Sequence, residues 1–394
     1  MSGIILTQYG GKIIGPIAKL LGYLMEGIFT VLDVIGIPNI GLSIILFTIV
    51  IYLLLMPLTI KQQKFSKLSA KMNPELQAIQ NKYKNKKDND SMMAMNQETQ
   101  AVYAKYGVSP TGSCLQLLIQ MPILFALYRV IYSMPAYVKQ IKEAFFPLVD
   151  KLIAQAGSAE LLQNFKNSNM YAKQFTNDAF VNGTTEYVQN TYIDCLNRAS
   201  SAEWQSIADK FPSLSADVAS TVEKLNEYNN FLGLNIGDSP SFMIKDAFTA
   251  GAYGMIIAAL MIPFLAAFTQ WLNVKLMPQP QSQGNNSQQD SVAASMKMMN
   301  TMMPIMSAVF CFTLPAGMGI YWIAGSVVRS IQQILINRHI DKIDMDEVIK
   351  KNLEKREKHC NSEINMLQKV DEFYGYKYHE MFDYKIRENE LIFI

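Results

Sequence analysis

Residues 45–72 read ILFTIVIYLLLMPLTIKQQKFSKLSAKM, and this stretch decides the fold. No charged residue occurs between Gly41 and Thr59, and at about 1.5 Å per residue the stretch just crosses a hydrocarbon core of about 30 Å. Pro57 ends the apolar run, and a helix studded with lysines follows at once: Lys61, Lys64, Lys67 and Lys71. This order predicts a membrane span that leads into a basic helix on the cytoplasmic side.

The composition points away from an ordinary soluble domain. The 394 residues are 50% hydrophobic and only 17% charged, whereas soluble domains carry about 25% charged residues. The four cysteines are scattered, and the three histidines all follow the last apolar block, so we expect no disulfide framework, metal site or other cofactor. The N-terminus lacks the basic start and compact apolar core of a cleavable signal peptide.

The alternation of apolar and polar blocks predicts an all-α, polytopic membrane protein with five transmembrane helices. The predicted spans cover residues 38–60, 109–134, 249–275, 297–314 and 315–337. Residues 61–108 carry nine lysines and four acidic residues, which predicts a cytoplasmic helical hairpin broken near Asn85–Asp90. Residues 135–248 carry nine basic and thirteen acidic residues, as an extracytoplasmic insert would. Residues 276–296 are predicted to form a flexible cytoplasmic loop, and residues 338–394 a cytoplasmic tail.

Residues 1–37 are predicted to form an extracytoplasmic segment. Its apolar residues recur at helical spacing, but Lys19, Glu26 and Asp33 interrupt them. Because charges within a span are costly, we expect an amphipathic helix lying in the membrane interface, with a poor first span as the alternative. Five spans with residues 61–108 inside place the N-terminus outside and the C-terminus in the cytoplasm.

Three blocks resemble the YidC/Oxa/Alb family of membrane protein insertases: MPLTIKQQKFSKLSAKM (56–72), GVSPTGSCLQLLIQMPILFALY (107–128) and MNTMMPIMSAVFCFTLPAGMGIYWIAGSVVRSIQQILI (299–336). The resemblance covers about Ile14 to Arg338, leaving out the insert and the tail. It implies an insertase in the bacterial plasma membrane, with a hydrophilic groove open to cytoplasm and lipid. Nascent membrane proteins and membrane lipid are the implied partners, without an enzymatic activity or a specific nucleic acid. The ribosome and the Sec translocon are further candidate partners.

The family pattern has an arginine five residues before a Pro-Leu pair in the first core span. Here the pair is Pro57-Leu58, and the corresponding residue is Tyr52, which offers a hydroxyl and no charge. Tyr321 and Trp322 resemble family positions that contact substrate. The candidate groove residues are Thr48, Tyr52, Gln120, Gln270, Tyr321, Trp322 and Arg329.

Five of the seven candidates have an alternative role. Thr48 could bond back to its own helix, Gln120 and Gln270 could join helices to one another, and Trp322 could anchor at the interface. Arg329 could snorkel to the inner headgroups. Tyr52 lies eleven residues after Gly41 and Arg329 lies eleven residues after Met318, so we expect them at the same depth, with Arg329 supplying the charge that Tyr52 lacks.

The main alternative function is a small-solute transporter or channel. It would need a discontinuous helix or an inverted repeat with a site at mid-membrane, and neither is evident in the sequence. A membrane enzyme finds no support in the sequence, which contains no P-loop, HExxH or GxSxG motif.

Overall fold

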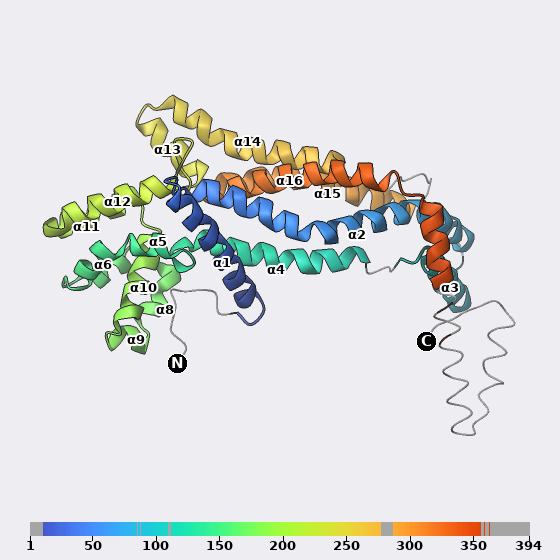
Figure 1. Cartoon of the computed structure of the whole chain (residues 1–394), viewed down its shortest axis with the longest axis horizontal. Coiled ribbons are helices and arrows are strands. Elements are labelled where there is room, and N and C mark those ends of the chain that lie inside the picture. The colour runs from blue at the N-terminus through green and yellow to red at the C-terminus, as the bar shows by residue number, and fades with distance from the viewer. Residues whose placement is uncertain are drawn as a thin grey trace, which may run out of the picture. The chain divides into compact units, whose positions relative to one another are not determined.

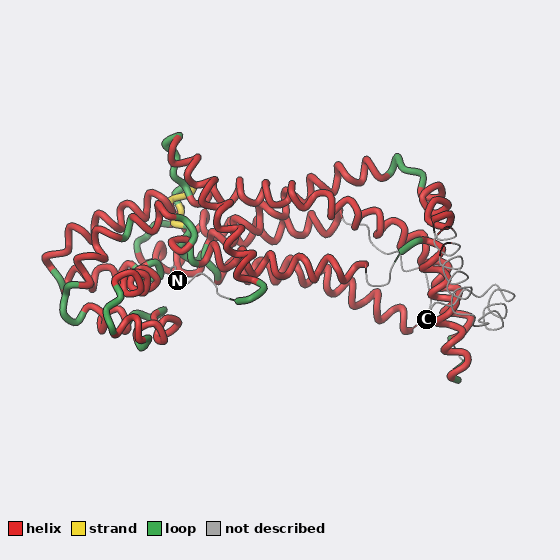
Figure 2. The backbone as a smooth tube through the Cα atoms, turned by 60° about the horizontal axis from the view of Figure 1, so that its bottom comes forward, coloured by secondary structure: helices red, strands yellow, loops and turns green. Residues whose placement is uncertain are grey.

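The chain is helical in the computed structural model, which describes residues 11–84, 86, 88–108, 112–276, 287–355, 358 and 362. Figure 2 shows helices along nearly the whole described chain and one short pair of strands. The long helices are α1 (Ile14–Val34), α2 (Ile40–Tyr83), α3 (Asn89–Tyr106), α4 (Gly112–Tyr132), α14 (Tyr253–Leu276), α15 (Ser287–Thr313) and α16 (Ala316–Ile340), labelled in Figure 1.

The chain divides into two compact units. The first contains Met1–Leu54, Leu118–Val274 and Met298–Ser330, and the second contains Leu55–Leu117, Lys275–Lys297 and Ile331–Ile394. Among the described residues, α2 with 44 residues and α14 with 24 are long and apolar enough to cross a membrane. Shorter apolar helical stretches occupy Met121–Tyr132 and Asn300–Thr313. The all-α class is thus confirmed, and the number of spans stays a prediction.

Helix α2 does not end where its apolar part ends. It runs from Ile40 to Tyr83 and contains Pro57 and Pro74 in its interior. The expected junction after Pro57 between a span and a separate basic helix is therefore wrong. Each proline removes one backbone donor, and the remaining backbone bonds of α2 continue through both positions.

Three other boundaries differ from the prediction. Residues 287–296, expected in a flexible loop, are helical and form the first turns of α15. Helix α16 continues to Ile340 instead of ending at 337. Residues 345–355, which fall in the predicted cytoplasmic tail, form a further helix. All three regions are polar for much of their length, so hydropathy alone did not reveal their helical structure.

The region between α4 and α14 folds around a hydrophobic core that also includes residues of α1 and of the long helices. Its elements are η1 (Met134–Ala136), α5 (Lys139–Glu143), α6 (Phe146–Ile153), α7 (Ser158–Gln163), η2 (Ser168–Tyr171), α8 (Ala172–Phe175), α9 (Asp178–Val181), α10 (Thr185–Leu196), α11 (Ser201–Lys210), η3 (Pro212–Leu214), α12 (Ser215–Asn229), β1 (Asn230–Phe231), β2 (Leu234–Asn235) and α13 (Pro240–Thr249). Phe145, Leu148, Leu152, Leu162 and Ile193 are fully buried. At roughly 1.5–3 kcal/mol per buried side chain, this core stabilises the insert substantially.

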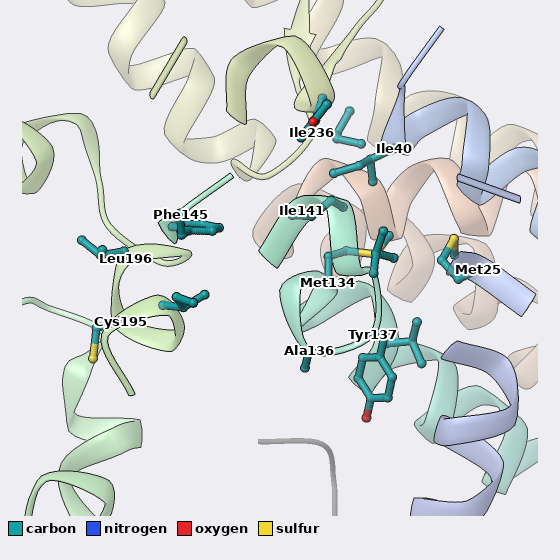
Figure 3. Packing of buried hydrophobic residues seen from close by; sticks show 14 of the residues in the cluster. Met25, Ile40, Met134, Ala136, Tyr137, Ile141, Phe145, Cys195, Leu196 and Ile236 are labelled. Carbon is teal, nitrogen blue, oxygen red and sulfur yellow. The ribbon is translucent and has the colours of Figure 1, made fainter. Parts of the chain in front are cut away.

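One face of α1 belongs to the same core. Met25 and Phe29 are buried, and the Phe29 ring meets the Tyr228 ring edge-on at 5.4 Å. The Thr30 hydroxyl accepts a hydrogen bond of 2.7 Å from the Gln140 amide. Figure 3 shows Met25 on its helix near Met134 and Tyr137 of the insert. The opposite face of α1 exposes apolar side chains, including Leu20 and Val31, so its place in the membrane interface stays a prediction.

The second unit has a separate small core. The buried residues come from α2, α3, α16 and residues 345–355, and they include Leu68, Met72, Tyr106, Ile340 and Met345. The Asn352 amide donates a hydrogen bond of 3.1 Å to the Tyr106 carbonyl. The helix 345–355 therefore packs on the predicted hairpin as a third helical element.

Candidate functional site

The most distinctive site in the first unit is a polar group centred on Arg329 of α16, which is partly buried and has three buried partners. Its guanidinium donates hydrogen bonds to the Tyr52 hydroxyl (2.5 Å), the Gln270 side-chain oxygen (3.2 Å) and the Ser326 hydroxyl (2.9 Å). Ser326 in turn donates to the same Gln270 oxygen at 3.0 Å. Three helices, α2, α14 and α16, thus each contribute a polar side chain to one connected network.

The spacing of polar residues along α16 explains why they share a face. Ser326, Arg329, Ser330, Gln333 and Asn337 follow one another at intervals of one, three or four residues, which places them along one side of a helix. Of this stripe, Arg329 alone was named from the sequence, although the spacing of the other four residues is visible there.

A glycine lets Tyr52 approach α16. A Cβ at Gly325 would lie 3.2 Å from Tyr52 Cε2 and 3.3 Å from the Tyr52 hydroxyl. The guanidinium carbon of Arg329 lies 5.4 Å from the centre of the Tyr52 ring, within the range of a cation–π interaction. The predicted contact between Arg329 and Tyr52 is therefore present, and snorkelling of Arg329 away from Tyr52 is not observed.

The positive charge of Arg329 is held by neutral oxygens. Within the part of the chain that the structure describes, no Asp or Glu oxygen lies within 4.0 Å of the guanidinium. Neutral dipoles stabilise a guanidinium without cancelling its charge, so the group keeps its attraction for an anion.

The other predicted site residues fall in different surroundings. Thr48 is fully buried and donates to the Ile44 carbonyl at 2.6 Å, which is the back-bonding alternative. Tyr321 is buried, and Trp322 is half-buried with its ring stacked on Phe310 at 6.2 Å. Gln120 lies in α4, and its side chain is outside the described residues.

Gln270 joins its helix to two others, as its alternative role predicted, and its part in a groove stays a prediction. Its oxygen belongs to the Arg329 network, and its nitrogen lies 3.3 Å from the Met303 sulfur of α15. One turn further along α14, Asn273 donates to Ser330 at 3.4 Å. Amides therefore join α14 to its neighbours and also ligate the arginine.

A second buried polar group lies in the second unit. The Gln63 amide of α2 donates to the Gln333 oxygen at 2.6 Å, and Gln333 donates to Asn337 at 3.0 Å. Gln63 and Gln333 are both buried. Gln63 was missed because it stands among the lysines that suggested an exposed helix.

The predicted lysine face is partly occupied by the chain itself. Lys67 forms an ion pair with Asp341, and Lys71 pairs with Asp346 at 2.8 Å. Lys61 is exposed and Lys64 is half-exposed. Residues 341–346 lie over this face because Met345 is buried beside Leu68 and Met72.

Ion pairs also join α3 to α2. Lys105 donates to Glu75 at 2.8 Å, Tyr106 donates to the same carboxylate at 2.8 Å, and Lys82 pairs with Glu98. The hydrogen bond from Lys105 lowers the pKa of Glu75, and burial raises the pKa of Tyr106 to about 12. Within the described ranges, no three His, Cys, Asp or Glu side chains gather in a way that could hold a metal ion.

Comparison with known proteins gives one family match. The family model of the 60Kd inner membrane protein matches residues 31–194 and 204–343. The match runs through most of the insert, which the sequence resemblance had left out.

The chain is similar to several curated proteins over a shorter stretch. It is 47% identical over 93 residues to the membrane protein insertase MisCA of Bacillus subtilis, covering 24% of this chain and 35% of that protein. It is 45% identical over 95 residues to the membrane protein insertase YidC of Fusobacterium nucleatum, covering 24% of this chain and 44% of that protein. A YidC of Bifidobacterium longum is 34% identical over 128 residues, covering 32% of this chain and 38% of that protein. The aligned stretches thus span less than half the length of these relatives.

Proposed function

Because this chain belongs to the family of the 60Kd inner membrane protein, we propose that it is a membrane protein insertase that inserts nascent integral membrane proteins and helps them fold. The observation that carries the proposal is the Arg329 network: a guanidinium without a carboxylate partner among the described residues, set between apolar helices. The insertase names of the similar proteins support the same function.

The proposed topology has five spans in the bacterial plasma membrane, with the N-terminus outside and the C-terminus in the cytoplasm. The five spans contain α2, α4, α14, α15 and α16, and the cytoplasmic hairpin contains the second part of α2 and α3. The excess of lysines in residues 61–106 supports this orientation.

In the proposed mechanism, polar side chains form a hydrophilic groove within the membrane. The groove shortens the low-dielectric path that the polar flank of a substrate must cross, since burying an unpaired polar group in hydrocarbon costs several kcal/mol. Arg329 attracts an acidic flank, and its neutral ligands supply replacement hydrogen bonds. The apolar helix of the substrate then partitions into lipid, which drives insertion. Lys61, Lys64, Lys67 and Lys71 gather the substrate near the cytoplasmic mouth.

Site-specific photo-crosslinking tests the proposal. A photoreactive amino acid in place of Trp322 is expected to capture a stalled nascent membrane protein, and not a stalled soluble chain. Val327 lies on the exposed side of the same helix and serves as the matched control position. Equal capture from both positions, or capture of both kinds of nascent chain, would contradict a groove beside Trp322. The same cross-linking, probed with antibodies, would report whether the ribosome or the Sec translocon is near.

A further inference from the structure

One short segment of the insert bonds to the first turns of two long helices. Residues 229–238, here called the strand segment, contain β1 and β2, which pair antiparallel with Asn230 opposite Asn235 and Phe231 opposite Leu234. The connecting residues Leu232 and Gly233 have φ values of 53° and 81°. Leucine rarely adopts a positive φ, so the surrounding bonds must hold this turn in place.

The strand segment is attached to the start of α2. The Asn39 oxygen accepts a hydrogen bond from the Leu42 N–H at 3.0 Å and so caps α2. The Asn39 nitrogen donates to the Asn230 carbonyl at 2.6 Å. Gly41 lies so close to Phe231 that a Cβ there would be 2.5 Å from the ring. One side chain and one close glycine therefore fix the first turn of α2 against the strand segment.

The same segment is attached to the start of α16. The Ala316 N–H donates to the Asp238 carbonyl at 2.8 Å, and the Gly317 N–H donates to the Ile236 carbonyl at 2.9 Å. Backbone N–H groups at a helix start have no partner within the helix, so these bonds satisfy them. Figure 3 shows Ile236 and Ile40, the first residue of α2, within the same packed cluster.

Both helices therefore leave a common anchor, and both reach the Arg329 network after nearly the same length. Tyr52 follows Gly41 by eleven residues and Arg329 follows Gly317 by twelve, which is about 16 Å and 18 Å at helical rise. We propose that the strand segment fixes the register of α2 against α16 and thereby holds Tyr52 against Arg329. This assigns the insert a positioning role in the membrane-embedded part, and only its consequence for insertion depends on the proposed function.

Helix geometry shows how sensitive the contact is to this register. A slip of one residue along either helix moves a side chain by about 1.5 Å and turns it by about 100°. Such a turn carries the Tyr52 hydroxyl out of hydrogen-bonding reach of the guanidinium. The contact thus requires both first turns to stay attached to the strand segment.

A cross-link between α2 and α16 measures the register directly. Cysteines replace Tyr52 and Gly325, which are in contact, in a background without the four native cysteines. A short bifunctional thiol reagent applied to membranes is expected to join them. The yield reports the register without any reference to substrate insertion.

Two perturbations weaken the anchor by different means. Asn39→Asp keeps the acceptor that caps α2 but loses the donor to Asn230, so the helix start is preserved while the attachment is lost. Gly41→Val displaces Phe231, and adding Phe231→Ala makes room again. Asn235→Asp is the matched control. It introduces one negative charge, as Asn39→Asp does, but on the strand segment itself, and it keeps the acceptor for the Gly237 N–H.

The cross-link is expected to decrease in Asn39→Asp and in Gly41→Val, to recover with Phe231→Ala, and to persist in Asn235→Asp. An unchanged yield in both perturbed variants would overturn the proposal. Insertion is assayed in parallel in proteins that retain Tyr52 and Gly325, and we expect it to fall with the cross-link yield. A lost cross-link with full insertion would leave the positioning role intact and instead refute the use of the Tyr52–Arg329 pair in insertion.

Discussion

Replacing Arg329 with glutamine is expected to stabilise the protein while impairing its activity. A charged side chain at the centre of a membrane helix costs roughly 2.5–3.5 kcal/mol, and the substitution relieves this cost. It removes two hydrogen bonds between helices, to Tyr52 and Gln270, each worth about 0.6 kcal/mol in membrane proteins. The bond to Ser326 lies within α16, and Gln270 keeps its bond from Ser326. The net expectation is a gain of roughly 1–2 kcal/mol in the free energy of unfolding.

Two measurements check this prediction. Unfolding in bicelles by denaturant gives the change in free energy, and insertion of a substrate with an acidic flank into inverted membrane vesicles gives the activity. Arg129→Gln is the matched control, since Arg129 is an exposed arginine of α4, and we expect it to leave insertion unchanged. Tyr52→Arg, which moves the charge to the facing helix, is expected to restore insertion to Arg329→Gln.

The result that would refute the reasoning is a loss of stability together with the loss of activity. It would mean that Arg329 holds the helices together and that the insertion defect is a folding defect. Normal insertion by a stably folded Arg329→Gln protein would equally contradict an electrostatic role for this residue.

Three further predictions concern residues outside the predicted spans. Cysteines at Lys84 and Asn182 are expected to react differently with an impermeant thiol reagent in intact cells, with only Asn182 labelled; equal labelling would contradict the five-span topology. Burial raises the pKa of Asp238 from 3.8 to about 6, and Asp246 adds to the effect. Because the pKa is higher in the folded protein, the stability is complete below pH 4 and is lost as the pH rises to about 6. Asp238→Asn should therefore flatten the pH dependence of the free energy of unfolding between these values. At pH 7 it should stabilise the protein by at most roughly 3 kcal/mol. Replacing Lys67 and Lys71 with glutamine is expected to cost less than about 1 kcal/mol per pair, because the pairs are exposed, yet to reduce insertion at unchanged protein levels in an immunoblot.

The long helices could be predicted from the sequence because their signal is local. The apolar run before Pro57 predicted the first part of α2, and the run after Tyr253 predicted α14. The continuation of α2 through Pro57 could not be predicted in this way, since it depends on packing of Leu68 and Met72 against segments distant in the sequence. The core of the insert could not be predicted for the same reason, because its short helices have little periodicity of their own.

The candidate site, too, could be predicted from the sequence only in part. The meeting of Tyr52 and Arg329 followed from equal depth in two apolar helices, which requires only residue counts and helical rise. The parts played by Ser326 and Gln63 depend on which helix faces lie together, and residue counts do not contain this information. Asn39 precedes the first turn of α2, and its bond to a residue 191 positions away could not be predicted from the sequence.

The amides of Gln63, Gln333 and Asn337 have a consequence for a polypeptide passing along α16. A side-chain amide is chemically the same group as a peptide unit, with a carbonyl oxygen and N–H donors. Gln63 and Gln333 are buried against each other, so under the proposed function a peptide unit of a substrate would replace an existing bond between amides, with no change in charge and no proton transfer. An exchange of this kind reads no sequence, since every residue except proline presents the same pair of groups. Under the same proposal, these amides would offer different substrates the same temporary replacement for water.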